Sequence, residues 1–385
     1  MKKLVAGALA ALVLAAPAAG QTLLPSDEQG TGEFGYSLAF SGDGKTLLVG
    51  GYKDAIGLGA AWVFTALGGT WVQQGPKLIA PDEHGTGWFG QSVALSQDGN
   101  TAVIGIPQEN ENTGTARVFV RSGDAWQQQA ELNNGGAEDA LGLGVALSGD
   151  GNVALLGAPK HNAVIGGAYV FTRTGSTWRR QPLVLSGRGE LRSGEFGLAV
   201  AMSADGKTLA VGGPGDNSGA GAVWTFARVG SRWVAGPKLL ARGERGHAEF
   251  GYSVALSADG KTLVVGGFRD NATKGAAWVF GRAANAWVQR AKLTAVAGPQ
   301  AGLGFSLAVS ADGTAVLTGG PAARNGSGAA WLFRRTTGGA WHLRRHWNGA
   351  ARTGLGYGVA LSGDGHLAAI GAPNDAGGSV NVVHV

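Results

Sequence analysis

The chain has 385 residues, of which 70 are glycine and none is cysteine, and its formal net charge is +5 at pH 7. Without cysteine the protein has no disulfide, no thiol catalysis and no lipid attached through a cysteine. The glycines follow no Gly-x-y period, which excludes collagen, and the lack of a basic stripe argues against a nucleic-acid partner.

The N-terminal segment has the pattern of a signal peptide. Lys2 and Lys3 precede an apolar run over residues 4–16, and small residues continue to Gly20. The run is too short to span a bilayer, and no other apolar run is long enough. We predict that residues 1–20 are a bacterial Sec-type signal peptide and that residues 21–385 form one domain. The mature protein is then secreted or periplasmic, without membrane insertion.

A repeat of 52 to 55 residues runs through the rest of the chain. Each copy begins with Phe-Gly or Leu-Gly, continues through a short alternating segment and reaches Ser-x-Asp-Gly. A fixed period of this length means that one supersecondary unit is copied around or along an axis. The seven copies begin near Phe34, Phe89, Leu141, Phe196, Phe250, Leu303 and Leu355.

The fifth copy shows what each unit builds. Residues 252–256 alternate as a strand, and Asp259 begins an Asp-Gly hairpin signal. Three more strands are predicted over residues 262–265, 275–280 and 287–293. No segment after the signal peptide has a sustained 3.6-residue period. The fold is therefore predicted to be all-β, a seven-bladed propeller with four antiparallel strands in each blade.

Two small residues are common to all seven copies. An alanine five residues after the leading Phe or Leu suits an inner strand that converges on the propeller axis. A serine two residues later can satisfy backbone groups of the Asp-Gly turn. Both patterns indicate scaffold residues.

The two ends of the chain predict how the ring closes. The seventh copy stops at residues 380–385, which match a third strand. Leu23 and Leu24, before Gly-Thr-Gly and Phe34, match Leu78 and Ile79 of the next copy. We predict that the N-terminal strand completes the last blade, because pairing the termini removes an exposed sheet edge.

The repeat resembles a known family. Phe-Gly-x-Ser-Val-Ala-x-Ser-x-Asp-Gly, followed by Gly-Ala-Pro at Gly157 and Gly371, is similar to the FG-GAP repeat of integrin α-subunit propellers and their bacterial relatives. The resemblance covers residues 21–385 and implies a seven-bladed propeller that serves ligand binding or adhesion. The calcium-binding integrin repeats carry Asp-x-Asp-x-Asp-Gly, whereas each hairpin here offers one carboxylate. Calcium needs six to eight oxygen ligands, so we predict no metal and no cofactor.

No enzyme motif appears in the sequence. There is no His-Glu-x-x-His, no Gly-x-Ser-x-Gly, no phosphate-binding loop and no dinucleotide fingerprint. We therefore assign no catalytic residue and predict a monomeric, non-enzymatic module that binds a protein or glycan. Two alternatives stay open: a carbohydrate-active lyase or hydrolase with acid–base residues over the central channel, and a purely structural surface component.

The loops between the second and third strands, and the loops that enter each blade, differ most between copies. We expect them on one face of the disc, where loops on a rigid scaffold commonly bind ligands. Trp88 is the foremost candidate, because other copies have Glu, Ala or Gly there. An aromatic residue at this position suggests stacking on a ligand, with packing on a neighbouring loop as the alternative. The candidate ligand-binding residues are Trp88, His84, Glu109, Glu111, His161, Arg245, His247, Arg269 and Asp270.

Overall fold

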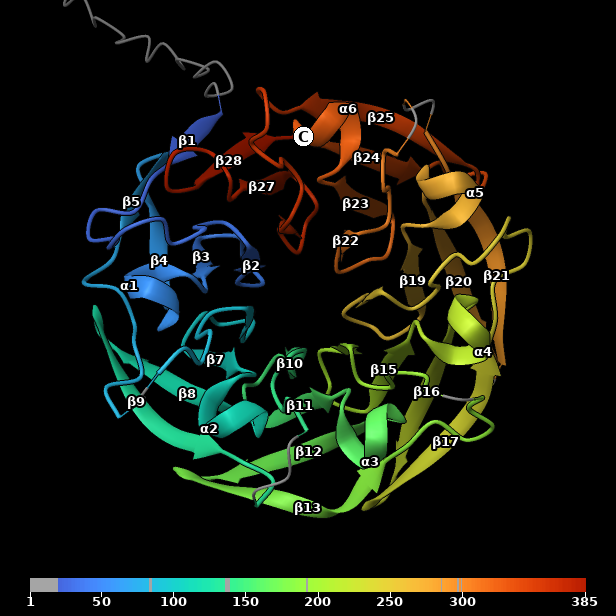
Figure 1. Cartoon of the computed structure of the whole chain (residues 1–385), viewed down its shortest axis with the longest axis horizontal. Coiled ribbons are helices and arrows are strands. Elements are labelled where there is room, and N and C mark those ends of the chain that lie inside the picture. Colours follow the sequence, from blue (N-terminus) through green and yellow to red (C-terminus); the bar gives the residue numbers. More distant parts are fainter. Residues whose placement is uncertain are drawn as a thin grey trace, which may run out of the picture.

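The computed structural model describes residues 20–385, apart from residues 83–84, 136–138, 192, 285, 296–297 and 299. Within this part of the chain, seven four-stranded antiparallel sheets form a ring around a central opening (Figure 1). This confirms the predicted seven-bladed propeller. The predicted signal peptide lies outside the described residues, apart from Gly20. No helix of the described residues has the length and apolar character that a membrane span requires.

The innermost strand of each blade is short and contains the predicted alanine. In four blades, a serine that begins this strand donates a hydrogen bond to a carbonyl of the next blade, as Ser37 does to Gly90 at 2.8 Å. The inner strands are β2 (Ser37–Phe40), β6 (Ser92–Leu95), β10 (Val145–Leu147), β14 (Ala199–Met202), β18 (Ser253–Leu256), β22 (Ser306–Val309) and β26 (Val359–Leu361).

The second strand is buried because neighbouring blades pack on both of its faces. A glycine near its end touches the next blade: a Cβ on Gly50 would lie 2.0 Å from the Gly90 carbonyl oxygen. The same contact recurs between all neighbouring blades, so a side chain has no room there. The second strands are β3 (Thr46–Gly51), β7 (Thr101–Ile106), β11 (Val153–Ala158), β15 (Thr208–Gly213), β19 (Thr262–Gly267), β23 (Ala315–Gly320) and β27 (Leu367–Ala372).

In blades 1 to 6 the third strand carries aromatic core residues. In blade 1, Trp62 meets the leading Phe34 edge-on at 5.3 Å between ring centroids, and both side chains are fully buried. Burying such a ring contributes roughly 1.5–3 kcal/mol, so the leading Phe is a core residue. The third strands are β4 (Ala60–Leu67), β8 (Thr115–Ser122), β12 (Gly167–Thr174), β16 (Ala222–Val229), β20 (Ala276–Ala283), β24 (Ala329–Arg335) and β28 (Ser379–His384).

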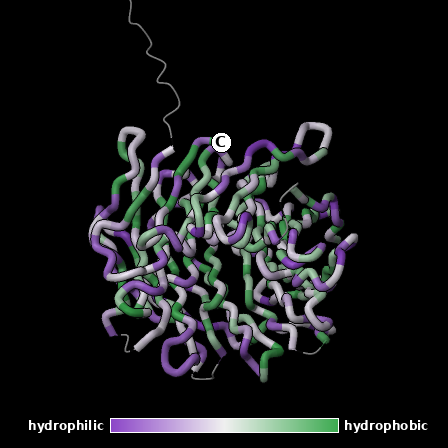
Figure 2. The backbone as a smooth tube through the Cα atoms, turned by 45° about the horizontal axis from the view of Figure 1, so that its top comes forward, coloured by the Kyte–Doolittle hydropathy of each residue, from purple (hydrophilic) through white to green (hydrophobic). Residues whose placement is uncertain are grey.

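The fourth strand forms the outer wall of the ring, and many of its side chains are exposed. Hydrophobic segments run through the body of the ring, while many loops at its edges are hydrophilic (Figure 2). The outer strands are β5 (Thr70–Gln73), β9 (Ala125–Leu132), β13 (Thr177–Leu185), β17 (Arg232–Leu239), β21 (Ala286–Leu293), β25 (Trp341–Asn348) and β1 (Gln21–Leu23).

The termini close the ring as predicted. Strand β1 pairs with β28 in the last blade, where Leu23 lies opposite Val380. The Gln21 side chain also exchanges two 2.8 Å hydrogen bonds with the backbone of Trp71 in blade 1. Of the two leucines expected in this strand, Leu23 is 2% exposed and Leu24 is 64% exposed. Leu24 therefore faces solvent, because it follows the last paired residue.

The Ser-x-Asp-Gly hairpins carry the predicted serine contact. Ser41 donates a 2.6 Å hydrogen bond to Asp43 and accepts one from the Thr46 amide at 3.0 Å. Asp43 also accepts a hydrogen bond from the Lys45 amide at 3.0 Å. Partial burial raises the pKa of Asp43, but these hydrogen bonds outweigh it, so its net pKa lies below the usual 3.8.

The loops between the second and third strands of blades 1 to 6 each contain one four-residue helical turn, an element that the periodicity did not predict. These turns are α1 (Asp54–Gly57), α2 (Glu109–Asn112), α3 (His161–Val164), α4 (Asp216–Gly219), α5 (Asp270–Thr273) and α6 (Ala323–Gly326).

Replacing Leu23 with alanine should lower the free energy of unfolding by about 2–5 kcal/mol, because a buried leucine is lost from the strand that closes the ring. The matched control, Leu24→Ala, removes an exposed side chain and should change it by less than about 0.5 kcal/mol. Denaturant unfolding of both variants measures the difference. Equal losses would show that β1 does not close the ring.

The hairpin aspartates predict a loss of stability in acid. A carboxyl with a lowered folded-state pKa stabilises the fold above its unfolded pKa, and this contribution disappears as pH falls through and below about 4. Asp98→Asn with Asp150→Asn, two aspartates whose pKa is also lowered, should flatten the fall in melting temperature between pH 5 and pH 2.5. The exposed Glu111→Gln serves as the control, and an equally flat curve for it would contradict the assignment.

Candidate functional site

Two sets of loops lie on one face of the ring, as predicted. The loop between the second and third strands of one blade ends beside the loop that enters the next blade. Isolated bridges join them, for example Gly59 with Phe89 and Gly166 with Phe196. The turns α1 to α6 are therefore seen together in Figure 1. We call this side of the ring the loop face.

The turns on the loop face have a left-handed backbone after their first residue. In α2 the φ angles of Asn110, Glu111 and Asn112 are 51°, 58° and 70°. This conformation costs about 1–2 kcal/mol for each residue other than glycine. Contacts outside the turn must therefore hold it, and in most blades the first residue of the turn makes them.

Blade 5 shows how a turn is held. Asp270, the first residue of α5, is 1% exposed. One carboxylate oxygen accepts a hydrogen bond from the Arg245 amide at 2.7 Å, and the other pairs with Lys292 Nζ at 2.7 Å. Lys292 in turn lies over the Trp278 ring, 5.0 Å from its centroid. The same pair recurs as Asp54–Lys77 and Asp216–Lys238.

Blades 2 and 3 hold their turns with other side chains: Glu109 in blade 2 is buried, whereas His161 in blade 3 is half-buried. Glu109 pairs with Arg117 at 2.7 Å and accepts a hydrogen bond from Thr115. His161 Nδ1 lies 3.0 Å from Asp139. Removing one partner from a buried charge pair leaves the other charge uncompensated, which is strongly destabilising. Glu109, His161 and Asp270, all expected to bind ligand, therefore make internal contacts that shape the loop face.

Three other candidate residues are open to solvent. The side chains of Glu111, Arg245 and His247 are exposed. Arg245 lines a hollow of about 470 Å³ together with Asp270 and Lys292. The structure thus brings Arg245 and Asp270 together at one place on the loop face.

The remaining candidates lie closer to the central opening or outside the described chain. Arg269 pairs with Glu249 at 3.0 Å and lies over the Phe268 ring, 5.5 Å from its centroid. Trp88 is half-buried and packs edge-on against Tyr52 at 5.3 Å. His84 lies outside the described residues.

Aromatic rings line part of the mouth of the central opening. Tyr36 stacks on Tyr357 at 5.5 Å between centroids, Tyr357 meets Phe305 at 5.3 Å, and Phe305 meets Tyr252 at 5.1 Å. These residues follow the Phe-Gly or Leu-Gly of blades 1, 7, 6 and 5. Each ring therefore lies where the inner strand of its blade begins, on the loop face.

Three more rings extend this series at its two ends. Tyr52 packs on Tyr36 at 4.6 Å and on Trp88 at 5.3 Å, and Phe268 packs on Tyr252 at 4.5 Å. All seven rings are half-buried, so the series has a face open to solvent. The seven residues, which we call the aromatic arc, are Trp88, Tyr52, Tyr36, Tyr357, Phe305, Tyr252 and Phe268.

Carboxylates accompany the aromatic arc. Glu33, Glu195 and Glu249 stand at the Trp88 position of blades 1, 4 and 5. Lys53 pairs with Glu33, and Arg269 pairs with Glu249. Burial raises the pKa of Glu195 and of Glu249, although Arg269 partly offsets the rise for Glu249. The mouth therefore combines aromatic surface with hydroxyl, carboxyl and guanidinium groups of nearly balanced charge.

Sequence reasoning found only Trp88 of this arc. It treated the start of each repeat as scaffold, whereas the structure brings rings together just before four of the inner strands. A comparison of the seven copies at the position after Phe-Gly or Leu-Gly could have predicted the arc. Four copies have an aromatic residue there, and the other three have Gln or Leu. The residues at that position are Tyr36, Gln91, Leu143, Leu198, Tyr252, Phe305 and Tyr357.

Comparison with known proteins supports the repeat and the fold. The family described as "FG-GAP repeat" matches residues 19–64, 71–119 and 233–280. A comparison with curated proteins gives no match. Among solved structures, hydrazine synthase of Kuenenia stuttgartiensis is similar, with a TM-score of 0.61 and 14% identity over 94% of this chain and 97% of that chain. At this identity the likeness shows the fold alone.

A buried glutamate beside one Asp–Lys pair predicts a second pH effect. Burial and the charge of Asp216 raise the pKa of Glu190 to about 7 from its usual 4.5. A raised carboxyl pKa stabilises the fold at low pH, and this contribution is lost as pH rises from about 4.5 through 7. The melting temperature should therefore fall between pH 5 and pH 8, and Glu190→Gln should flatten this fall.

The control for Glu190→Gln is the exposed Glu111→Gln, which should keep the wild-type slope. A Glu190→Gln variant whose melting temperature falls as steeply as the wild type would show that Glu190 ionises normally in the folded protein.

Proposed function

This chain is an FG-GAP repeat protein with the fold of a seven-bladed β-propeller, and from that premise we propose that it is a binding module for a glycan. The glycan lies on the loop face, across the aromatic arc at the mouth of the central opening. The observation that carries this proposal is the unbroken contact of seven half-buried rings from five blades.

Aromatic rings provide rigid contact area at a small conformational cost, because they have only two rotatable side-chain bonds. Their apolar faces suit the C–H faces of sugar rings, while tyrosine hydroxyls provide hydrogen bonds at the ring edges. Tyr36, Tyr252 and Tyr357 place such hydroxyls in the arc. Ligand sites commonly combine apolar and aromatic surface with a few polar groups in this way.

The charge pattern of the mouth favours a neutral glycan over a strongly charged polymer. Lys53 balances Glu33, and Arg269 balances Glu249, which leaves Glu195 as the carboxylate of this set without a cation partner in the described chain. Paired charges still offer directional hydrogen bonds to sugar hydroxyls, but they attract neither polyanions nor polycations over a distance.

The extent of the arc favours a chain of several sugar units. The arc crosses blades 5, 6, 7, 1 and 2, whereas Leu143 and Leu198 occupy the corresponding position in blades 3 and 4. The ligand therefore lies off the propeller axis. Export by the proposed signal peptide over residues 1–20 would place the protein where it meets envelope or extracellular polysaccharides.

Substitutions borrowed from sibling repeats test the site without disturbing the scaffold. Trp88→Glu and Tyr36→Leu introduce residues that other blades carry at the same positions. Each should weaken glycan binding about tenfold, the loss expected for one stacking ring worth about 1.4 kcal/mol. The loss of ring–ring contacts should lower the free energy of unfolding by about 0.5–1.5 kcal/mol per contact, which leaves the protein folded. A glycan array followed by calorimetry on the best ligand measures the effect.

The matched control is Leu143→Tyr, which adds a ring outside the arc and should leave binding intact or strengthen it. If the double variant Trp88→Glu/Tyr36→Leu still bound the glycan, the binding site would lie outside the aromatic arc. If the wild type bound no glycan on the array, the proposal of a glycan ligand would be wrong. Capture of one protein by the wild type but not by these variants would then identify a protein ligand instead.

A further inference from the structure

A side-chain clasp joins the outer walls of neighbouring blades. Between blades 2 and 3, the Gln129 carbonyl oxygen accepts hydrogen bonds from Trp178 Nε1 at 3.0 Å and from Arg173 at 3.2 Å. Arg173 also reaches Thr101 of blade 2 at 3.3 Å. A glutamine amide from one blade is thus held by an indole, and by a guanidinium, of the next.

The clasp recurs at the two neighbouring junctions. Between blades 1 and 2, Gln74 accepts from Trp126 Nε1 at 3.2 Å and from Arg121 at 3.5 Å. Between blades 3 and 4, Gln181 accepts from Trp233 Nε1 at 3.0 Å. In each blade the glutamine stands three residues after the tryptophan of the outer strand.

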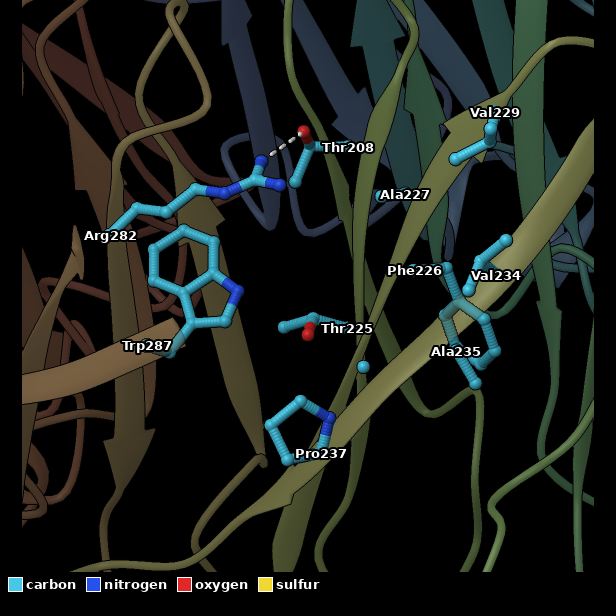
Figure 3. A pocket seen from close by; sticks show the side chains of 11 residues that line it. Thr208, Thr225, Phe226, Ala227, Val229, Val234, Ala235, Pro237, Arg282 and Trp287 are labelled. Atoms are coloured by element: carbon cyan, nitrogen blue, oxygen red, sulfur yellow. Dashed lines mark hydrogen bonds between the residues drawn. The ribbon is translucent and has the colours of Figure 1, made fainter. Parts of the chain in front are cut away.

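Between blades 4 and 5 the glutamine is missing. Trp287 is present, and Arg282 donates to Thr208 at 3.3 Å as its counterparts do to Thr46 and Thr101. Gly236, however, stands three residues after Trp233, where blades 1 to 3 have glutamine and blades 5 and 6 have Arg290 and Arg344. A hollow of about 330 Å³ lies there, with Trp287, Arg282 and Pro237 among its walls (Figure 3).

A second substitution adds a polar group to this hollow. Thr225 stands where five other blades have valine. It is 4% exposed, its hydroxyl has no hydrogen-bond partner in the described chain, and it lies between Trp287 and Pro237 in Figure 3. A Cβ on Gly236 would come within 2.6 Å of the Thr225 hydroxyl, so the hollow depends on that glycine.

We propose that this hollow binds the amide group of a small ligand, either a primary carboxamide or an N-acetyl group. Trp287 Nε1 and Arg282 donate to its carbonyl oxygen, as their counterparts do to Gln129. The Thr225 hydroxyl accepts from its N–H. The remaining walls, including Phe226, Val234 and Pro237, provide apolar contact for the rest of the ligand.

The structure favours an amide over a carboxylate because three sibling clasps hold a neutral amide oxygen with the indole N–H, two of them with an arginine as well. Trp287 is half-buried and its indole N–H has no acceptor in the described chain, so an amide carbonyl that enters the hollow would provide one. The site lies on the outer wall, away from the aromatic arc. It is therefore independent of glycan binding at the mouth of the opening.

Indole N–H signals in ¹H–¹⁵N spectra of the ¹⁵N-labelled protein test the proposal. Propionamide, N-acetylglucosamine and acetate, each up to 50 mM, are the three probes. We expect the amide probes to shift the Trp287 signal and to leave those of Trp126, Trp178 and Trp233 in place, because these indoles are already bonded. A larger shift with propionamide than with N-acetylglucosamine would indicate a primary carboxamide as the ligand, and the reverse would indicate an N-acetyl sugar.

Variants locate the effect. Thr225→Val, which installs the residue of sibling blades, should weaken the response severalfold, and Gly236→Gln should abolish it by restoring the clasp. Gln129→Gly should make the Trp178 signal responsive, which transfers the site to another junction even if Gly236→Gln folds poorly. The proposal would be overturned if the amide probes did not shift the Trp287 signal, or if acetate shifted it equally. It would also be overturned if Thr225→Val kept the full response while Gln129→Gly gave no response at Trp178.

Discussion

The ring depends on one backbone contact that is repeated between all neighbouring blades. A glycine near the end of each second strand lies against the carbonyl of the glycine that follows the leading Phe or Leu of the next blade, as Gly50 does against Gly90. Any side chain at the first glycine would overlap that carbonyl, because the separation from a Cβ would be about 2 Å. The close contact between these two glycine backbones sets the spacing of neighbouring blades. The contact of Gly371 with Gly35 joins blade 7 to blade 1 and so closes the ring.

The same contact places the aromatic arc. The residue after each leading Phe-Gly or Leu-Gly emerges at the mouth of the opening, beside its counterpart in the adjacent blade. Where both residues are aromatic they touch, as Tyr36 and Tyr357 do across the closure. A rigid scaffold thus holds side chains from distant repeats within contact distance, which is the arrangement that ligand binding needs. The loops around the mouth are held by buried pairs such as Asp270–Lys292.

The two proposed sites arise in the same way, from single copies that depart from the repeat. Tyr52 replaces a proline that five other copies have, and it joins Trp88 to the arc. Gly236 stands where blades 1 to 3 have glutamine, and a hollow opens beside it on the outer wall. Because the scaffold contacts are redundant, a departure at one junction changes the local surface without unfolding the ring. Sibling repeats therefore provide ready controls for each site.

The sequence by itself determined the number of blades, their four strands, the serine contact of the hairpins and the closure by the N-terminal strand. These features follow from a period of two, from turn residues and from the repeat length, all of which are local or countable. It could not show that Asp270, Glu109 and His161 are held by contacts within the protein, since their partners Lys292, Arg117 and Asp139 lie in other strands and loops. Only the tertiary structure decided which residues meet, because closing the ring brings Tyr36 and Tyr357 together from opposite ends of the chain.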